Sequence, residues 1–278
     1  MSIRYAVGLP NVGEFGDPNV LVELAGLAEE SGWDGVYLWD HVLYHDPAWP
    51  VANPTVTAAA IAVATRRLRL IVMHVLPRRR THVVARESVT LDTLSGGRLT
   101  FATAIGSMDL EYAGFGESPR GRGATLDAAL ADLCALWSGA PVVVSGGSAP
   151  VQMLPVSVQQ PRIPIWCGGR WPHRAPLRRA ARFEGAMPTF PDQNTRVVPP
   201  AEFAEAVGVI AAERDGLVGY DIALEGSSAP GGAPAAAAGY VEHGLTWWVE
   251  AMGWWRAATD AHPGAGVAAA RTRIVAGP

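Results

Sequence analysis

The stretch VYLWDHVLYHDP, residues 36–47, places four ionisable side chains directly behind an apolar run that has the composition of a buried strand. Histidine can act as a general acid or base because its pKa lies near neutral pH. Asp40 is adjacent to His41 and can fix the tautomer of its imidazole or raise its basicity. A solvated or capping Asp–His pair is the competing interpretation, and it is the one we favour for His45 and Asp46.

The stretch CGGRWPHRAPLRRAARFEG, residues 167–185, has the composition of an anion-binding turn. Two consecutive glycines, Gly168 and Gly169, let backbone N–H groups approach a phosphate closely, and the helix expected to follow adds its positive end. Arg170 or Arg174 can add further charge. The competing interpretation is a tight strand–helix turn that needs glycine for its backbone conformation, and the stretch is not a GxGxxG dinucleotide fingerprint.

Two further motifs give weaker indications of chemistry. The arginine triplet at 78–80 is more typical of a solvated loop or a subunit contact than of a ligand site. The tryptophan pairs at 247–248 and 254–255 are more typical of a core or an interface than of a binding platform. Trp247, if it faces inward at the end of its strand, can line a substrate pocket.

These motifs lie within an alternation of short apolar strands and amphipathic helices. Asp17 and Asn53 have the residue type of helix N-caps, and a proline follows each of them. The nearly unbroken apolar strands are typical of a parallel sheet buried on both faces. The expected strands are 3–9, 36–39, 67–75, 98–105, 163–167, 185–190, 220–224 and 244–249.

The expected helices separate these strands. They are one from Pro18 that ends at Gly32, one that begins at Pro54, one that ends near Leu94, and those at 126–137, 176–184, 200–214 and from 247 or later to 259. The low-complexity stretches 145–150 and 227–238 are expected to be loops. Eight strand–helix steps in 278 residues predict an α/β fold, a (β/α)8 TIM barrel that spans residues 1–278 as a single domain.

A barrel of this kind gives the motifs a common location, because its active site lies at the C-terminal ends of the strands. Residues from four strands are expected at that rim: Asp40 and His41 after the second strand, His74 and Val75 after the third, Gly106 after the fourth, and Cys167 to Arg170 after the fifth. The ionisable stretch at 36–47 is therefore expected where a barrel keeps its reactive groups.

Composition excludes several functional classes. The chain has no lysine, so all 22 basic residues are arginine, and Schiff-base and pyridoxal-phosphate chemistry is excluded. A net charge of −4 argues against nucleic acid as a partner. No apolar segment approaches the roughly 20 residues that cross a bilayer, and no secretory signal is expected. Cys134 and Cys167 are expected to be reduced, in a cytoplasmic protein.

Several stretches together resemble the bacterial luciferase-like superfamily, which comprises flavin- or deazaflavin-dependent oxidoreductases with a (β/α)8 barrel. In order and spacing they cover nearly the whole chain, and ESVTLDTLSGGRL followed by an apolar strand is a strong signature of that family. The other segments are YAVGLPNVGEFGDP, GWDGVYLWDH, FGESPRGR, LWSG, QQPRIPIWCGGRWPHRAPLRRAARFEG and RTRIVAGP.

The resemblance implies roles for the residues after the second and third strands. It implies that Asp40 and His41 face the reactive ring of the cofactor, with His41 as the proton donor or acceptor. It also implies a non-prolyl cis peptide that presses against the ring, which maps to His74–Val75 or to Met73–His74.

The resemblance implies a phosphate contact at Gly168 and Gly169, with Arg170 as an added contact. After the fourth strand, relatives commonly have a glycine-rich GVGxG, whereas this chain has ATAIG at 102–106 and keeps only Gly106. The extra methyl groups either crowd the cofactor ring or repack the barrel.

The resulting hypothesis is an oxidoreductase that binds FMN or coenzyme F420 at the rim and acts on a small organic substrate. F420-dependent hydride transfer is slightly favoured over FMN-dependent monooxygenation, which would need reduced FMN from a separate reductase. The expected substrate-lining residues are Trp39, Phe115 and Trp247, and the resemblance implies a homodimer.

Two other functions stay open. One is a family member that binds flavin without turnover, because the loop after the fourth strand is altered. The other is a metal-dependent barrel hydrolase or isomerase that would use His41, His74 and Asp40 as ligands. The second is disfavoured, since the first strand is not followed by His-x-His and the chain has no lysine to carbamylate.

Overall fold

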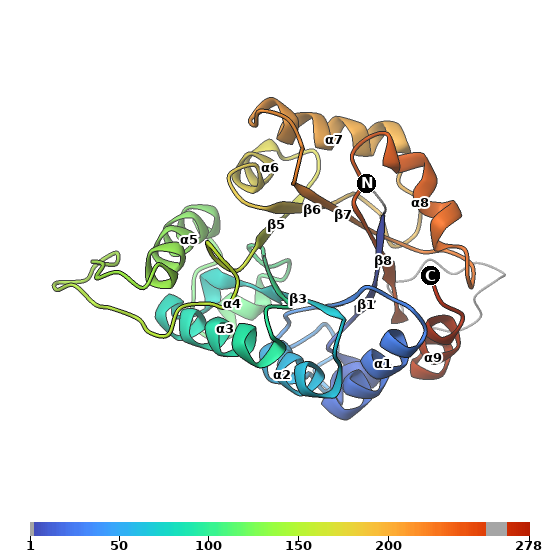
Figure 1. The fold of residues 1–278 in the computed structure, drawn as a ribbon, viewed down its shortest axis with the longest axis horizontal. Coiled ribbons are helices and arrows are strands. Elements are labelled where there is room, and N and C mark those ends of the chain that lie inside the picture. Colours follow the sequence, from blue (N-terminus) through green and yellow to red (C-terminus); the bar gives the residue numbers. More distant parts are fainter. Residues whose placement is uncertain (1–2, 254–265) are drawn as a thin grey trace.

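Eight parallel strands close into a barrel in which each strand pairs with the next in sequence and the eighth pairs with the first (Figure 1). The structure is a computed structural model and describes residues 3–253 and 266–278. Each expected strand overlaps an observed one, which confirms the predicted (β/α)8 barrel. The strands are β1 (Arg4–Leu9), β2 (Gly35–Leu38), β3 (Arg69–His74), β4 (Leu99–Thr103), β5 (Ile165–Arg170), β6 (Gly185–Thr189), β7 (Asp221–Gly226) and β8 (Trp247–Ala251).

Helices connect the strands and surround the barrel on its outside (Figure 1). They are α1 (Pro18–Glu30), α2 (Pro54–Ala64), α3 (Thr81–Ser95), α4 (Leu110–Ala113), α5 (Arg122–Trp137), α6 (Arg174–Ala180), α7 (Pro200–Ala212), α8 (Ala233–Val241) and α9 (Val267–Val275), with short 3₁₀ turns η1 (Gly13–Gly16) and η2 (Leu76–Arg78). Within residues 3–253 and 266–278, none of the helices has the length and apolarity needed to cross a bilayer.

The predicted N-caps hold the first two long helices. The carboxylate of Asp17 accepts a hydrogen bond from the Asn19 amide at 2.8 Å, and Pro18 follows as the first residue of α1. The side chain of Asn53 accepts from the Val56 amide at 3.1 Å, and Pro54 begins α2. Both caps satisfy an amide that has no partner within the helix, so both helices begin where the sequence predicts.

Three helices, α4, α8 and α9, were missed by the sequence analysis. The stretch 227–238, predicted to be a loop because of its low complexity, contains the start of α8, which buries Ala233, Ala237 and Tyr240 against the core. Helix α9 near the C-terminus was not predicted at all. The helix expected from 247 or later to 259 does not include 247–251, which form strand β8, and most of its remainder lies outside the described residues. Residues 145–150 do form a turn, between the bridged Val142 and Val151.

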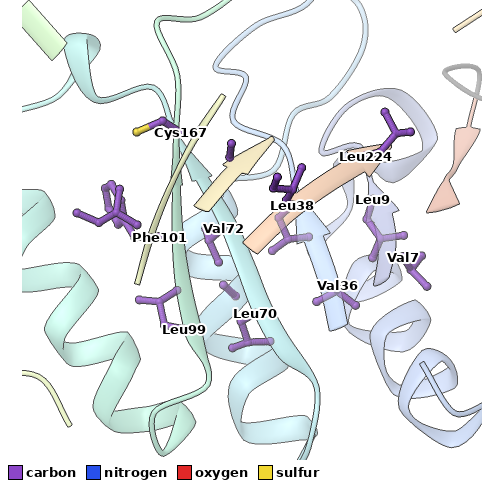
Figure 2. Packing of buried hydrophobic residues seen from close by; sticks show 14 of the residues in the cluster. Val7, Leu9, Val36, Leu38, Leu70, Val72, Leu99, Phe101, Cys167 and Leu224 are labelled. Atoms are coloured by element: carbon purple, nitrogen blue, oxygen red, sulfur yellow. The ribbon is translucent and has the colours of Figure 1, made fainter. Parts of the chain in front are cut away.

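The barrel has one core between strands and helices and another inside the cylinder. Figure 2 shows outward-facing strand residues, among them Leu9, Leu38 and Phe101, that pack in the cluster shared with the helices. The residues between them point inward, because side chains alternate along a strand. A separate cluster fills the interior and consists of Ala6, Tyr37, Trp39, Ile71, Met73, Ala102, Trp166, Met187, Ala223, Trp247 and Val249, with Ala104 packed against it. The barrel is therefore filled through its middle, and a ligand can enter only at an end.

Candidate active site

The residues predicted for the rim come from strands that end at the same pole of the barrel. Strand β2 pairs with β3 and β3 with β4 in parallel register, and Thr103 of β4 pairs with Cys167 of β5. Asp40 and His41 follow β2 after Trp39, and Gly168 and Gly169 lie in the C-terminal half of β5. The structure thus brings the imidazole and the glycine pair to one end of the barrel, which we call the C-terminal rim.

The carboxylate of Asp40 is directed toward β3 and is buried, with the residue 4% exposed. Its Oδ2 accepts a hydrogen bond from the Val75 amide at 2.7 Å, and its Oδ1 accepts from the Arg79 guanidinium at 2.6 Å. Both oxygens are occupied by groups other than the imidazole next in sequence. The expectation that Asp40 orients His41 is therefore wrong, because consecutive residues at the end of a strand project in different directions.

His41 is held by contacts from two other segments. Asn11, after β1, accepts from the His41 amide at 3.3 Å and donates to its carbonyl at 3.1 Å. Imidazole Nδ1 lies 3.3 Å from Oε1 of Glu111, a hydrogen-bonding distance, and the side chain is 12% exposed. The ring of Tyr44 meets the imidazole edge-on, with centroids 4.9 Å apart. With Nδ1 facing Glu111, Nε2 is the nitrogen left to meet a ligand.

Glu111, on the short helix α4, is a functional candidate that the sequence analysis missed. The residue is 1% exposed, and Oε1 also accepts from the Val42 amide at 2.8 Å and lies 2.6 Å from the Arg78 guanidinium. Burial raises the pKa of this carboxyl, but the contacts with His41, Val42 and Arg78 outweigh burial and hold its pKa below the ordinary value. Glu111 is therefore ionised at neutral pH and supplies the negative charge beside His41.

Two arginines of the triplet at 78–80 are part of this cluster, which contradicts their predicted role as solvated loop residues. Arg78 and Arg79 have side chains only 6% and 18% exposed. Arg78 contacts Glu111 and donates to the Asp40 carbonyl at 2.8 Å, while Arg79 pairs with the Asp40 carboxylate. Two buried carboxylates thus face two buried guanidinium groups, as burial of charge requires.

His74 faces away from the barrel interior. Its ring stacks on Phe101 with centroids 4.3 Å apart, and its Nε2 lies 3.3 Å from the Thr55 hydroxyl on α2. Burial, and secondarily the charge of Arg79, lowers the pKa of His74 to about 4. Its imidazole therefore packs as a neutral ring between barrel and helix, and only its backbone can face a ligand at the rim.

We expect His74 to make the protein less stable in acid. The unfolded chain binds a proton at this residue near pH 6.5, whereas the folded protein does so only near pH 4. The free energy of unfolding should therefore fall by about 3 kcal/mol as the pH falls from about 6.5 to about 4. Between pH 7 and pH 5 the loss should be about 2 kcal/mol, and urea unfolding at these two pH values measures it. In His74→Phe, which keeps the stack on Phe101, the loss should be smaller by that amount, and an identical loss in both proteins would contradict the assignment.

The peptide bonds that precede and follow His74 are trans. The cis peptides of the described residues are Leu154–Pro155, Gln160–Pro161 and Trp171–Pro172. The predicted non-prolyl cis bond at His74–Val75 or Met73–His74 is therefore wrong. The Val75 amide is held by Asp40 and the His74 carbonyl by the Thr103 hydroxyl at 2.8 Å, which fixes this backbone in the trans form.

The glycines at the rim have different surroundings. Gly106 has a φ of +76°, and a Cβ there would lie 3.0 Å from Val75 Cγ1. Gly168 follows inward-facing Trp166 by two residues, so a Cβ there would point into the barrel, 3.3 Å from the Ala104 Cβ. Gly169 points outward, and a Cβ there would lie 2.5 Å from Pro176 Cβ on α6. Of the two consecutive glycines, Gly168 therefore faces the interior of the barrel and Gly169 does not.

Substitution of Gly169 should destabilise the fold through helix α6. The methyl group of Gly169→Ala would overlap Pro176, so β5 or α6 must move, at a cost of about 1–3 kcal/mol. Urea unfolding measures this cost. Gly208→Ala, in α7, is the control, because an added Cβ there meets no atom within 4 Å. Equal stability of the two variants would contradict the packing argument.

The three predicted substrate-lining residues do not lie together. Trp39 faces inward beneath the rim, and its ring lies 6.0 Å from that of His41. Phe115, in the connection after α4, is 62% exposed. Trp247 is the first residue of β8, so it faces inward at the opposite end of the barrel, where Arg4 covers its ring at 4.3 Å. Trp247 cannot line the rim, and that prediction is wrong.

The remaining polar candidates give no second centre. His45 and Asp46 are exposed, and Asp46 accepts from the Ala48 amide at 2.9 Å as a turn residue, in agreement with the solvated interpretation. Within residues 3–253 and 266–278, no three His, Cys, Asp or Glu side chains are grouped so that they could hold a metal ion. The ligand set His41, His74 and Asp40 does not converge, because His74 faces α2.

Comparison with known proteins gives a match to one family and likenesses of fold to solved structures. The family model described as luciferase-like monooxygenase matches residues 6–274. The 4-hydroxyprotoasukamycin monooxygenase of Streptomyces nodosus subsp. asukaensis is 33% identical over 97 residues, which are 34% of this chain and 25% of that protein. The match thus spans about a quarter of that relative's own length.

Two solved structures share the fold over most of the chain. Monooxygenase RslO1 from Streptomyces bottropensis has a TM-score of 0.67 and 22% identity, and the match covers 87% of this chain and 77% of that one. The coenzyme F420-dependent tetrahydromethanopterin reductase from Methanopyrus kandleri has a TM-score of 0.71 and 15% identity, over 99% of this chain and 97% of that one.

Proposed function

Because this chain belongs to the luciferase-like monooxygenase family, we propose that it is an oxidoreductase that binds a flavin or deazaflavin at the C-terminal rim and acts on a small organic substrate. The observation that carries the proposal is the His41–Glu111 contact, which places an acid–base group at the end of the barrel where such enzymes react. In this proposal His41 donates or accepts the proton, and Glu111 positions its imidazole through Nδ1.

The residues of the rim fit a planar cofactor. Four of the inward-facing positions near the rim carry small side chains or none: Gly8, Ala104, Gly168 and Ala251. Such positions let a ring approach the backbone closely. We propose that Gly106, Gly168 and the backbone of Val75 border the ring, and that Arg170, which is exposed beside Gly169, meets its phosphate. When bound, the cofactor supplies hydride transfer or reaction with oxygen.

The protein's own contribution to the reaction is to orient the substrate and move a proton. Nε2 of His41 is the group that exchanges the proton, and Glu111 stabilises the imidazolium through Nδ1. Trp39, inside the barrel next to His41, keeps water from the floor of the site. Phe115 would reach a ligand from its exposed position after α4.

We favour F420 over FMN as the cofactor. The likeness to the F420-dependent reductase covers 97% of that protein, whereas the likeness to monooxygenase RslO1 covers 77% of it. The matched region is therefore nearly the whole of the deazaflavin enzyme but a smaller share of the monooxygenase. The match to the 4-hydroxyprotoasukamycin monooxygenase supports the second candidate, an FMN-dependent monooxygenase supplied by a separate reductase.

Titration of the purified protein with each cofactor tests the proposal. We expect F420 fluorescence to be quenched on binding, and Gly168→Ala to weaken the binding of F420 because its methyl group points into the rim. Tighter binding of reduced FMN would instead support the monooxygenase. A protein that binds neither cofactor would refute both, and one that binds cofactor without turnover on any substrate would be the non-catalytic member.

We also propose that the chain forms a homodimer. The connection between α5 and β5 extends away from the barrel (Figure 1) and exposes apolar side chains: Val143, Val151, Leu154 and Val158, each 46–60% exposed. A second copy would remove this apolar surface from water. Light scattering after size exclusion should give twice the mass of the chain, and Val151→Asp with Val158→Asp should shift it toward one chain. A monomeric wild-type protein would overturn this proposal.

A further inference from the structure

The cluster beside His41 contains a cation in addition to the histidine and the carboxylate that could exchange a proton. Glu111 Oε1 is contacted by both the His41 imidazole, at 3.3 Å, and the Arg78 guanidinium, at 2.6 Å. Arg78 is the nearer of the two and carries a fixed charge, since a guanidinium does not lose its proton in proteins. A protonated His41 must therefore share one carboxylate oxygen with a permanent cation.

We propose that Arg78 is a positioning residue that sets how strongly the His41–Glu111 pair holds a proton, by sharing the carboxylate of Glu111 with the imidazole. A cation at the carboxylate offsets part of the negative charge that would stabilise an imidazolium. The pair therefore releases its proton more readily than an isolated His–Glu pair would. The proposal rests on the proposed function only for the statement that this proton takes part in the reaction.

Among the charged groups around the His41–Glu111 pair, Arg78 is the one that contacts the Glu111 carboxylate. The charged and titratable groups around this pair are Arg78 of η2, the Arg79–Asp40 ion pair, Tyr44 of the loop that contains His41, and Tyr112 of α4. Arg79 pairs with the Asp40 carboxylate at 2.6 Å, which Arg78 approaches only to 3.6 Å, and the Tyr112 hydroxyl donates to the Ile105 carbonyl at 2.7 Å. Burial raises the pKa of Tyr112, so this hydroxyl stays neutral. Arg78 is thus the cation that acts on Glu111.

The geometry also explains why Arg78 can hold this position while a flexible surface arginine could not. Its side chain is 6% exposed, and its second terminal nitrogen donates to the Asp40 carbonyl at 2.8 Å. The planar fork is therefore fixed between the residue before His41 and the carboxylate that contacts His41. Arg78 connects the end of β2, the start of the connection after β3, and α4.

A pH titration of histidine ring signals by NMR, on protein without cofactor, tests the proposal. The signal of His41 is identified by its loss in His41→Asn. In Arg78→Gln we expect the pH midpoint at which the pair takes up a proton to rise by about one pH unit or more. In Arg78→Lys, which keeps the charge, the midpoint should stay close to that of the wild type. An unchanged midpoint in Arg78→Gln would overturn the proposal.

A double variant keeps the test decisive if Arg78→Gln fails to fold. Glu111→Gln with Arg78→Gln removes both charges, so neither is left buried alone. Loss of the carboxylate should lower the pH midpoint of His41 and loss of the cation should raise it, so this double variant should titrate at a higher pH than Glu111→Gln alone. Equal midpoints in the two variants would overturn the proposal. The histidine NMR signals are measured without cofactor. Failure of the protein to bind F420 or FMN would therefore refute the proposed function and leave the role of Arg78 to be decided by these titrations.

Discussion

His41→Ala should reduce turnover by a factor of about 10² to 10⁴ while the protein stays folded. The loss follows from removal of the group that exchanges the proton, and it should appear in kcat with whichever cofactor binds. The fold should survive, because the imidazole lies at the rim and the backbone at this position is held by Asn11. The measurement is a steady-state rate with a substrate identified by screening, together with the thermal midpoint.

His45→Ala is the matched control for this variant. His45 lies in the same loop as His41 and is exposed. Its ring contacts that of Tyr44, the residue before it. Its replacement should leave kcat within a factor of about two, as expected for a surface substitution. Equal losses in the two variants would indicate damage to the loop. Full activity of His41→Ala would remove His41 from the mechanism.

The barrel itself could be predicted because its determinants are local. Each strand is an unbroken apolar run, and the first two helices begin at a cap residue followed by proline. Helix α8 could not be predicted in this way, because alanine, glycine and proline in one stretch have the composition of a flexible loop. Its formation depends on burial of Ala237 and Tyr240 against the barrel, which is a tertiary effect.

The location of the site could be predicted, but its internal contacts could not. The rule that strands of a barrel end at one pole places His41 and Gly168 correctly. The partner of His41 is Glu111, which is 70 positions further along the chain, and the adjacent Asp40 serves the next strand instead. The contact between Glu111 and His41 depends on the packing of α4 against the rim. The sequence LEYAG around Glu111 gives no indication of that contact.

The second buried charge cluster fixes helix α9 to the barrel. Glu250 of β8 is fully buried, and its carboxylate accepts from the Ser228 amide at 2.9 Å, the Ser228 hydroxyl at 2.7 Å and the Trp248 indole at 2.9 Å. Arg273 of α9 approaches it at 3.3 Å and donates to the Gly277 carbonyl at 2.6 Å. The guanidinium also lies 5.0 Å from the ring of Trp33, which follows α1. This cluster therefore closes the ring of helices between α1 and α9.

Arg273→Met should be the most destabilising of the substitutions considered, because it removes the cation from beside a carboxylate that has no access to water. Breaking a buried ion pair costs about 3–5 kcal/mol, which for a chain of this size lowers the thermal midpoint by roughly 10 °C. Urea unfolding and calorimetry measure both quantities. Arg271→Met is the control on the same helix, since Arg271 pairs with Glu23 on the surface, where both side chains are nearly half exposed. Its midpoint should hardly change, and a loss as large as that of Arg273→Met would show that α9 is sensitive to any substitution rather than held by the buried pair.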